Sequence, residues 1–264
     1  MIALYHAQDE LEGGLMQHSG FIDRGDGIRL AWAQLQGRGP TLVFLPGLRS
    51  DMQGSKAIAL HAFCAERGHA MLRLDYSGHG ASDGAFESGS IGEWASDALH
   101  IIKARTQGPI LLVGSSMGGW IGLLLSRALG DRLAGYVGIA AAPDFTERLM
   151  WASMTPQERE TILTTGELRV PSEYGDDMVI TSRLIEDGRQ QLVLDSPLPM
   201  PCPVRLLQGQ LDPDVPWELA LTLAAHIGSP DVQTILIKDG DHRLSRPQDL
   251  ALLIATLTSL LGED

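Results

Sequence analysis

Cysteines, aromatic residues and long apolar runs are all scarce in this chain of 264 residues. Its two cysteines, Cys64 and Cys202, belong to no Cys-x-x-Cys or Cys/His ligand spacing, so we expect reduced, structural thiols and no metal site. No apolar run approaches the roughly 18 residues that a membrane-spanning helix needs, so no stable membrane insertion is expected. Residues 1–14 show neither an apolar secretion signal nor an Arg-rich transit pattern. The expected compartment is the cytoplasm.

Basic residues are also in the minority, because 20 Lys and Arg stand against 33 Asp and Glu and leave a net charge of −13. A chain with this charge repels a polyanion on average, and the sequence contains no Lys/Arg run that would form a basic patch. Nucleic acid is therefore not an expected partner. Hydrophobic residues make up 44 % of the chain. That share is typical of a globular domain with a large buried core.

Short apolar runs alternate with amphipathic stretches, which is typical of an α/β domain with a mostly parallel sheet and helices on both faces. The predicted strands are residues 28–36, 41–45, 70–74, 110–113, 133–140, 204–207 and 232–237. The predicted helices are 55–67, one that opens at Ser90, 117–129, 217–227 and 247–261. Ser90 and Glu93 have the spacing of a capping box at that helix start.

The alternation breaks between residues 144 and 200. We interpret this segment as a helical lid inserted into a single domain, whose core comprises about residues 20–143 and 201–264. Thr155-Pro156 with Glu158 predicts a helix start, and Gly166 predicts its end. Residues 178–192 are predicted to form a second helical run.

Two pentapeptides match Gly-x-Ser-x-Gly, in which a serine occupies a sharp turn between a strand and a helix. Chance supplies about 0.2 matches at this composition, so context must decide between them. The match at 114–118 directly follows an apolar strand and enters a predicted helix, and Ser116 is therefore the predicted nucleophile. Ser115, one residue off the centre, is expected to support the turn. The match at 80–84 lies in a loop, so Ser82 is not expected to be catalytic.

A serine nucleophile needs a base that takes its proton and an acid that orients the base. On this kind of turn the chain order is serine, acid, histidine. Two histidines follow Ser116: His226 falls inside a predicted helix, whereas His242 lies in a loop just past the last predicted strand and is the predicted base. Asp212, at the end of the preceding strand, is the preferred acid. Asp214 is the alternative, although its place near a helix start suits a first-turn acid.

Acyl transfer also requires backbone N–H groups directed at the developing oxyanion. We expect one from Met117, directly after the nucleophile, and the other from Leu48, in the loop after the strand at 41–45. Asp75 and His79 are interpreted as hydrogen-bonding loop residues, with a place at the pocket rim as the alternative.

These residues resemble the α/β-hydrolase superfamily. Five longer runs, covering most of the chain from about Asp23 onward, resemble the abhydrolase-domain palmitoyl-protein thioesterase family: LPGLRSDMQGSKA, RLDYSGHGASDG, GSSMGGWIGLLL, GIAAAPDFTERLMW and KDGDHRLS. The resemblance implies an α/β-hydrolase fold, and cleavage of long-chain acyl thioesters on proteins, or of acyl glucuronides, without a cofactor. It assigns the family's triad to Ser116, Asp212 and His242.

The leading hypothesis is a serine hydrolase that cleaves acyl thioesters or esters through an acyl-enzyme, with a small acyl compound or an S-acylated protein as substrate. The alternatives are a general carboxylesterase on small soluble esters or acyl glucuronides, and a non-catalytic binding module that retains the fold. The oligomeric state is left open. Apolar lid residues are candidates for an acyl groove, because flexible Met suits adaptable apolar surfaces, and packing of the lid explains the same residues. These candidates are Met150, Trp151, Met154, Ile180 and Leu184.

Overall fold

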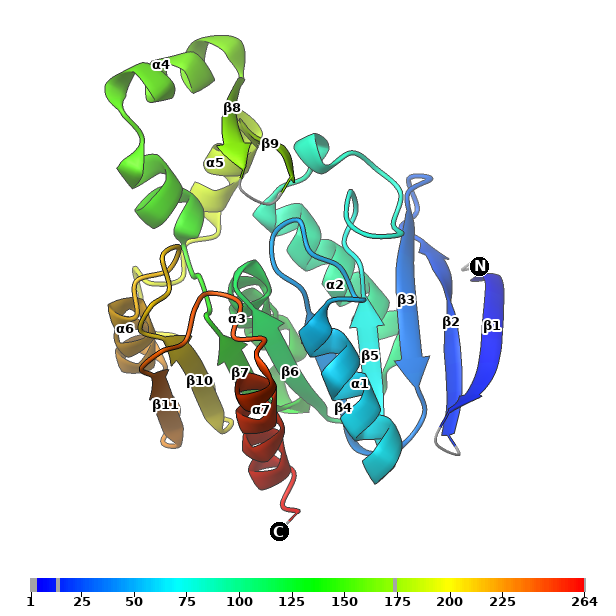
Figure 1. The fold of residues 1–264 in the computed structure, drawn as a ribbon. Helices are drawn as coiled ribbons and strands as arrows, with labels where there is room; N and C mark the ends of the chain where they lie inside the picture. The colour runs from blue at the N-terminus through cyan, green and yellow to red at the C-terminus, as the bar shows by residue number, and fades with distance from the viewer. Residues whose placement is uncertain (1–3, 13–14, 173–174, 264) are drawn as a thin grey trace.

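The computed structural model describes residues 4–12, 15–172 and 175–263. These residues form a nine-stranded sheet in the order β1-β2-β3-β5-β4-β6-β7-β10-β11 (Figure 1). Neighbours from β5 to β11 pair in parallel, whereas β1, β2 and β3 form an antiparallel edge. The strands are β1 (Leu4–Glu12), β2 (Leu15–Asp23), β3 (Arg29–Leu35), β4 (Arg38–Leu45), β5 (His69–Leu74), β6 (Ile110–Ser115), β7 (Leu133–Ile139), β10 (Val204–Gly209) and β11 (Val232–Ile237).

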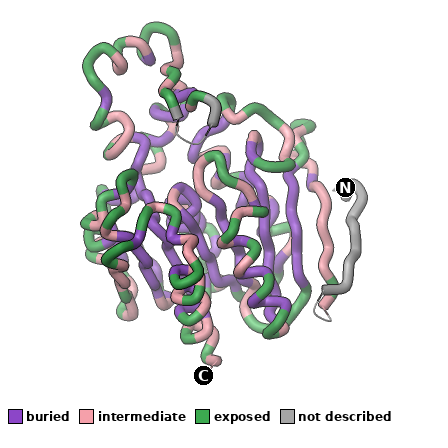
Figure 2. The backbone as a smooth tube through the Cα atoms, in the orientation of Figure 1, coloured by how far each residue is buried: buried purple, intermediate pink, exposed green. Residues whose placement is uncertain are grey.

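Helices cover both faces of this sheet, as the sequence predicts. The helices of the core are α1 (Ser55–Arg67), α2 (Ile91–Arg105), α3 (Met117–Leu129), α6 (Glu218–His226) and α7 (Pro247–Leu260). Apolar side chains of α2, α3 and α6 pack on one face, and those of α1 and α7 pack on the other. Every residue of β5, β6 and β10 is buried, because parallel strands covered on both sides expose neither face (Figure 2). The predicted α/β fold is confirmed.

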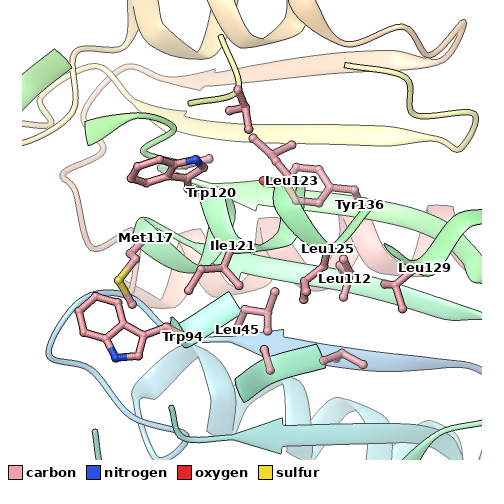
Figure 3. Close-up of a cluster of buried hydrophobic side chains, with 14 of the residues drawn as sticks. Leu45, Trp94, Leu112, Met117, Trp120, Ile121, Leu123, Leu125, Leu129 and Tyr136 are labelled. Atoms are coloured by element: carbon pink, nitrogen blue, oxygen red, sulfur yellow. The ribbon is translucent and has the colours of Figure 1, made fainter. Parts of the chain in front are cut away.

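The larger core cluster surrounds α3 (Figure 3). Trp94, Trp120 and Tyr136 are fully buried there. The polar tips of all three rings find backbone carbonyl partners. The Trp94 indole donates to Ser77 at 3.1 Å, the Trp120 indole donates to Gln191 at 3.1 Å, and the Tyr136 hydroxyl donates to Gly119 at 2.9 Å. This packing fixes α3, and therefore its N-terminal turn, against the sheet.

The inserted segment contains α4 (Pro156–Thr165) and α5 (Ser182–Gln190), preceded by a π-helical turn (Thr146–Trp151). The predicted start of α4 is confirmed, because Thr155 and Glu158 form a capping box. Its predicted end is also confirmed, since Gly166 caps the helix in the left-handed conformation with φ 85°.

The prediction that residues 178–192 are helical is wrong at its beginning. The segment also contains an antiparallel pair, β8 (Glu167–Ser172) and β9 (Gly175–Thr181), and α5 starts only at Ser182. Leu168 lies opposite Ile180 and Val170 lies opposite Met178, so alternate apolar residues of the two strands meet. The inserted segment is therefore helical only in part.

Two carboxylates fix the position of this segment, one within it and one on the core. Asp144 is fully buried and accepts the backbone N–H groups of Val193 at 2.8 Å and Leu194 at 3.0 Å, which joins the two ends of the insertion. Asp187 of α5 accepts the N–H of Gly92 at 2.7 Å. That carboxylate satisfies an otherwise unpaired donor at the start of α2.

The capping box expected at the start of α2 is absent. Ser90 is the N-cap residue, but its side chain makes no capping hydrogen bond. Glu93 instead forms ion pairs with Arg24 at 2.8 Å and with Arg183 of the insertion at 2.9 Å. Tertiary ion pairs have thus replaced the local cap that the spacing predicts.

Cys64 and Cys202 are free and buried, as the sequence predicts. Burial raises the pKa of the Cys64 thiol to about 12 and that of the Cys202 thiol to about 11. Both thiols are therefore protonated at neutral pH. Within the described residues, no helix has the length and apolar character to span a bilayer.

Candidate active site

A single residue, Ser116, connects the end of β6 to the start of α3. Its φ is 53°, in the left-handed region that residues other than glycine seldom adopt. The conformation is held from both sides: its N–H donates to the carbonyl of Ile139 at 2.9 Å, and its carbonyl accepts the N–H of Ala142 at 3.2 Å. Strain held in this way is typical of functional turns.

The glycines flanking Ser116 are required by close backbone contacts. A Cβ on Gly114 would lie 2.3 Å from the carbonyl oxygen of Gly118, and a Cβ on Gly118 would lie 2.0 Å from that of Leu45. Gly47 faces the serine directly, because a Cβ there would lie 3.4 Å from Ser116 Cβ. The motif is therefore a steric requirement of this turn.

His242 and Asp212 approach Ser116 from the loops that follow β11 and β10. His242 Nε2 is 3.0 Å from Ser116 Oγ, and His242 Nδ1 is 2.9 Å from Asp212 Oδ2. In this arrangement the serine hydroxyl donates to Nε2, while Nδ1–H donates to the carboxylate, which selects the imidazole tautomer. The structure thus brings the three sequence candidates together at the carboxyl ends of the parallel strands.

The Asp212 carboxylate accepts several hydrogen bonds in addition to the one from His242. Its side chain is fully buried, and Oδ1 accepts the N–H groups of Asp214 at 2.9 Å and Val215 at 2.8 Å. Gln208 donates to Oδ2 at 2.9 Å. Burial acts to raise the pKa of this carboxyl, but the hydrogen bond and charge of His242, together with the two backbone N–H groups, lower it overall. Asp212 is therefore ionised at neutral pH.

The other polar side chains considered in the sequence make local contacts outside this hydrogen-bonded set. Ser82 donates to the carbonyl of Asp75 at 2.8 Å and accepts the N–H of Ala31 at 2.8 Å. His226 binds a carbonyl within its own helix. His79 is buried against three aromatic rings and also lines a smaller cavity of about 180 Å³.

A cavity of about 420 Å³ opens beside Ser116 and His242. Most of the residues that line it are polar, and besides Ser116 and His242 they include Arg49, Ser50, Ser55, Lys56, Ser115, Asp214, Arg243 and Ser245. The large apolar side chains that line it are Phe44, Leu48 and Met178. Sequence reasoning considered Ser115 and Asp214, but it did not anticipate the other polar residues, which come from α1, from the loop before it and from the His242 loop.

The five lid residues suggested for an acyl groove do not line this cavity. Four of them pack in a small cluster within the insertion: Met150, Trp151, Met154 and Ile180. Leu184 is buried in the larger core cluster. Among the described residues of the insertion, Met178 of β9 lines the cavity. The sequence of β9, GDDMVIT, has no alternating pattern that would have identified it. An acyl groove formed by the five stays a prediction.

The two expected oxyanion donors are available. The N–H groups of Leu48 and Met117 make no hydrogen bond to any group in the part of the chain that the structure describes. Leu48 lines the cavity, and Met117 is the first residue of α3, where N–H groups have no partner within the helix.

Asp212, Asp214 and His242 also place three potential ligand atoms within 4.8 Å of one another. Both oxygens of Asp212 and both nitrogens of His242 already take part in hydrogen bonds, however. The arrangement favours proton transfer over a cation site.

A family model described as the alpha/beta hydrolase family matches residues 42–252. The chain belongs to this family. It is 40 % identical to the mouse palmitoyl-protein thioesterase ABHD10, mitochondrial, over 92 % of this chain and 82 % of that protein. The human protein of the same name is 37 % identical over 92 % of this chain and 80 % of its own length.

Solved structures agree with the assignment of this chain to the alpha/beta hydrolase family. A protein from Agrobacterium vitis S4 matches with a TM-score of 0.88 and 39 % identity, covering 94 % of this chain and 99 % of that one. Mouse alpha/beta hydrolase domain-containing protein 10 matches with a TM-score of 0.86 and 38 % identity. The match covers 93 % of this chain and 98 % of the mouse chain. The predicted family and the prediction of a serine hydrolase are confirmed. The curated relatives are named as mitochondrial, so the cytoplasm stays a prediction for this chain.

Gly118→Ala tests the steric account of the turn. We expect it to lower the free energy of unfolding by about 3 kcal/mol or more, because the new Cβ meets backbone that cannot rotate away. Gly108→Ala is the matched control, since a Cβ there meets nothing within 4 Å. Urea denaturation of both variants measures the difference, and equal stabilities would contradict the account.

Proposed function

We propose that this chain hydrolyses acyl thioesters or esters with Ser116 as nucleophile, His242 as base and Asp212 as the residue that orients the base. The observation that carries the proposal is the line of hydrogen bonds from Ser116 Oγ to His242 Nε2 at 3.0 Å and from His242 Nδ1 to Asp212 Oδ2 at 2.9 Å. The strained turn that presents Ser116 supports the same assignment.

The reaction follows from this geometry. Ser116 Oγ attacks the acyl carbonyl carbon as its proton passes to His242 Nε2, and the N–H groups of Leu48 and Met117 stabilise the resulting oxyanion. The Asp212 carboxylate stabilises the imidazolium, which then gives its proton to the departing thiolate or alkoxide. Water, deprotonated by His242, hydrolyses the acyl ester on Ser116 and restores the free enzyme. No step requires a cofactor.

The substrate we propose is a long-chain acyl thioester on a protein. The support is the similarity to mitochondrial palmitoyl-protein thioesterases, which extends over 92 % of this chain. In this proposal, residues 144–200 act as a lid over the cavity, with Met178 as the point of contact. An S-acylated protein would then be the partner of this enzyme.

A second candidate is hydrolysis of small polar esters, such as acyl glucuronides. The wall of the cavity favours it, because two arginines, Arg49 and Arg243, line the space beside Ser116 in a chain whose net charge is −13. Positive charge concentrated in this way attracts a leaving group that carries a carboxylate.

Replacing the nucleophile tests the mechanism, and the second Gly-x-Ser-x-Gly serine supplies a matched control. Ser116→Ala is expected to lower kcat by at least about 10³-fold, because no other group can form the acyl-enzyme. Ser82→Ala loses two hydrogen bonds and about 1 kcal/mol of stability for each, but kcat should stay within about twofold. Wild-type turnover by Ser116→Ala, or inactivity of folded Ser82→Ala, would sink the assignment.

A series of matched thioesters and oxygen esters, from acetyl to palmitoyl, separates the two candidate substrates. The leading proposal predicts that kcat/KM rises steeply with chain length and is higher for each thioester than for the matched ester. Activity that is flat across the series, or highest for short esters, would move the function to a general esterase. Ser116→Ala provides the background for each compound.

A further inference from the structure

Lys56 connects α1 to the loop that carries His242. It is the second residue of α1, and its Nζ donates to the carbonyl oxygen of Arg243 at 2.5 Å and to Ser245 Oγ at 3.3 Å. The two partners lie 187 and 189 positions further along the chain. Lys56, Arg243 and Ser245 form part of the same cavity wall as Ser116 and His242.

The carbonyl that Lys56 holds is next to the proposed base, because Arg243 directly follows His242. The backbone there is strained, since Leu244 has a φ of 42°. Its N–H donates to the side chain of Asp241 at 2.9 Å, which is a contact within the loop itself. Lys56 adds a charge-assisted hydrogen bond from a separate element of the fold.

Several charges act on this ammonium. Burial and the charge of Arg243 lower the pKa of Lys56 to about 8, against the attraction of Asp241 and Asp249. The group is therefore protonated below about pH 8 and loses its charge above that value.

We propose that Lys56 is a positioning residue, which holds the carbonyl of Arg243 so that His242 stays aligned with Ser116. The proposal rests on the proposed function, in which His242 is the base. This positioning role differs from direct binding of an anionic substrate. Because Lys56 would act through the His242 loop, its loss would affect neutral and anionic substrates alike.

Lys56→Met removes the hydrogen bonds while keeping most of the side-chain volume. We expect kcat to fall about tenfold and KM to change less than about twofold, equally for a thioester with a neutral leaving group and one with a carboxylate leaving group. Lys103→Met, at an exposed position on α2, is the matched control and should behave as wild type. An unchanged kcat, or a rise in KM confined to the anionic substrate, would overturn the proposal.

Lys56→Arg tests the charge, because a guanidinium stays protonated where this lysine does not. Wild-type kcat is expected to fall as the pH rises through about 8, and Lys56→Arg should recover activity relative to Lys56→Met and lack this decrease. Identical pH profiles for wild type and Lys56→Arg would contradict the role assigned to the ammonium.

Labelling of Ser116 by a fluorophosphonate tests the role of Lys56 without a thioester substrate. Its result therefore does not depend on whether the proposed substrate is correct. The labelling rate reports alignment of His242 with Ser116 even if the wild type cleaves no thioester, and it should fall about tenfold in Lys56→Met. Where that variant does not fold, Ser245→Ala removes one acceptor of Lys56, together with the hydrogen bond that Ser245 Oγ itself donates to the Arg243 carbonyl at 2.9 Å, and should slow labelling about two- to threefold. Unchanged labelling in a folded variant overturns the proposal.

Discussion

The first turn of α3 lies so close to the end of β4 that no side chain fits between them at Gly118. This contact forces the chain to turn within a single residue, and Ser116 adopts a left-handed conformation as a result. The strain is offset by the burial of α3, where Trp120 and Ile121 are fully buried. A short turn on a rigid helix leaves the serine hydroxyl little freedom, which suits a nucleophile that must meet its base at 3.0 Å.

The same kind of backbone contact places the other two groups. A Cβ on Gly209, at the end of β10, would lie 2.3 Å from the carbonyl oxygen of Gly240, so the loops that carry Asp212 and His242 pack backbone against backbone. The fold therefore brings serine, base and acid together through these two close backbone approaches at one sheet edge. The hydrogen bonds of His242 with Ser116 and Asp212 then orient side chains whose backbone positions are already fixed.

Local sequence was sufficient for the helices of the core, for seven of the nine strands of the sheet and for the order of the candidate triad, whereas β1 and β2 at the antiparallel edge were not predicted. Apolar runs such as Ile110–Val113 are continuous because both faces are covered, and the chain order of Ser116, Asp212 and His242 needs no knowledge of distances. Contacts between distant segments were not predictable. Nothing near Lys56 indicates a partner 187 residues away. The β8–β9 pair was missed because the short apolar run at 178–180 was assigned to the helix that follows it.

An acyl-enzyme on Ser116 is the central claim, and rapid acid quenching during turnover of a palmitoyl thioester, followed by peptide mass mapping, tests it most directly. The account predicts an acyl group in ester linkage on Ser116, within the peptide that contains residues 114–118. An acyl group found instead on Ser82 or Ser115, or turnover with no acylated serine, would contradict it.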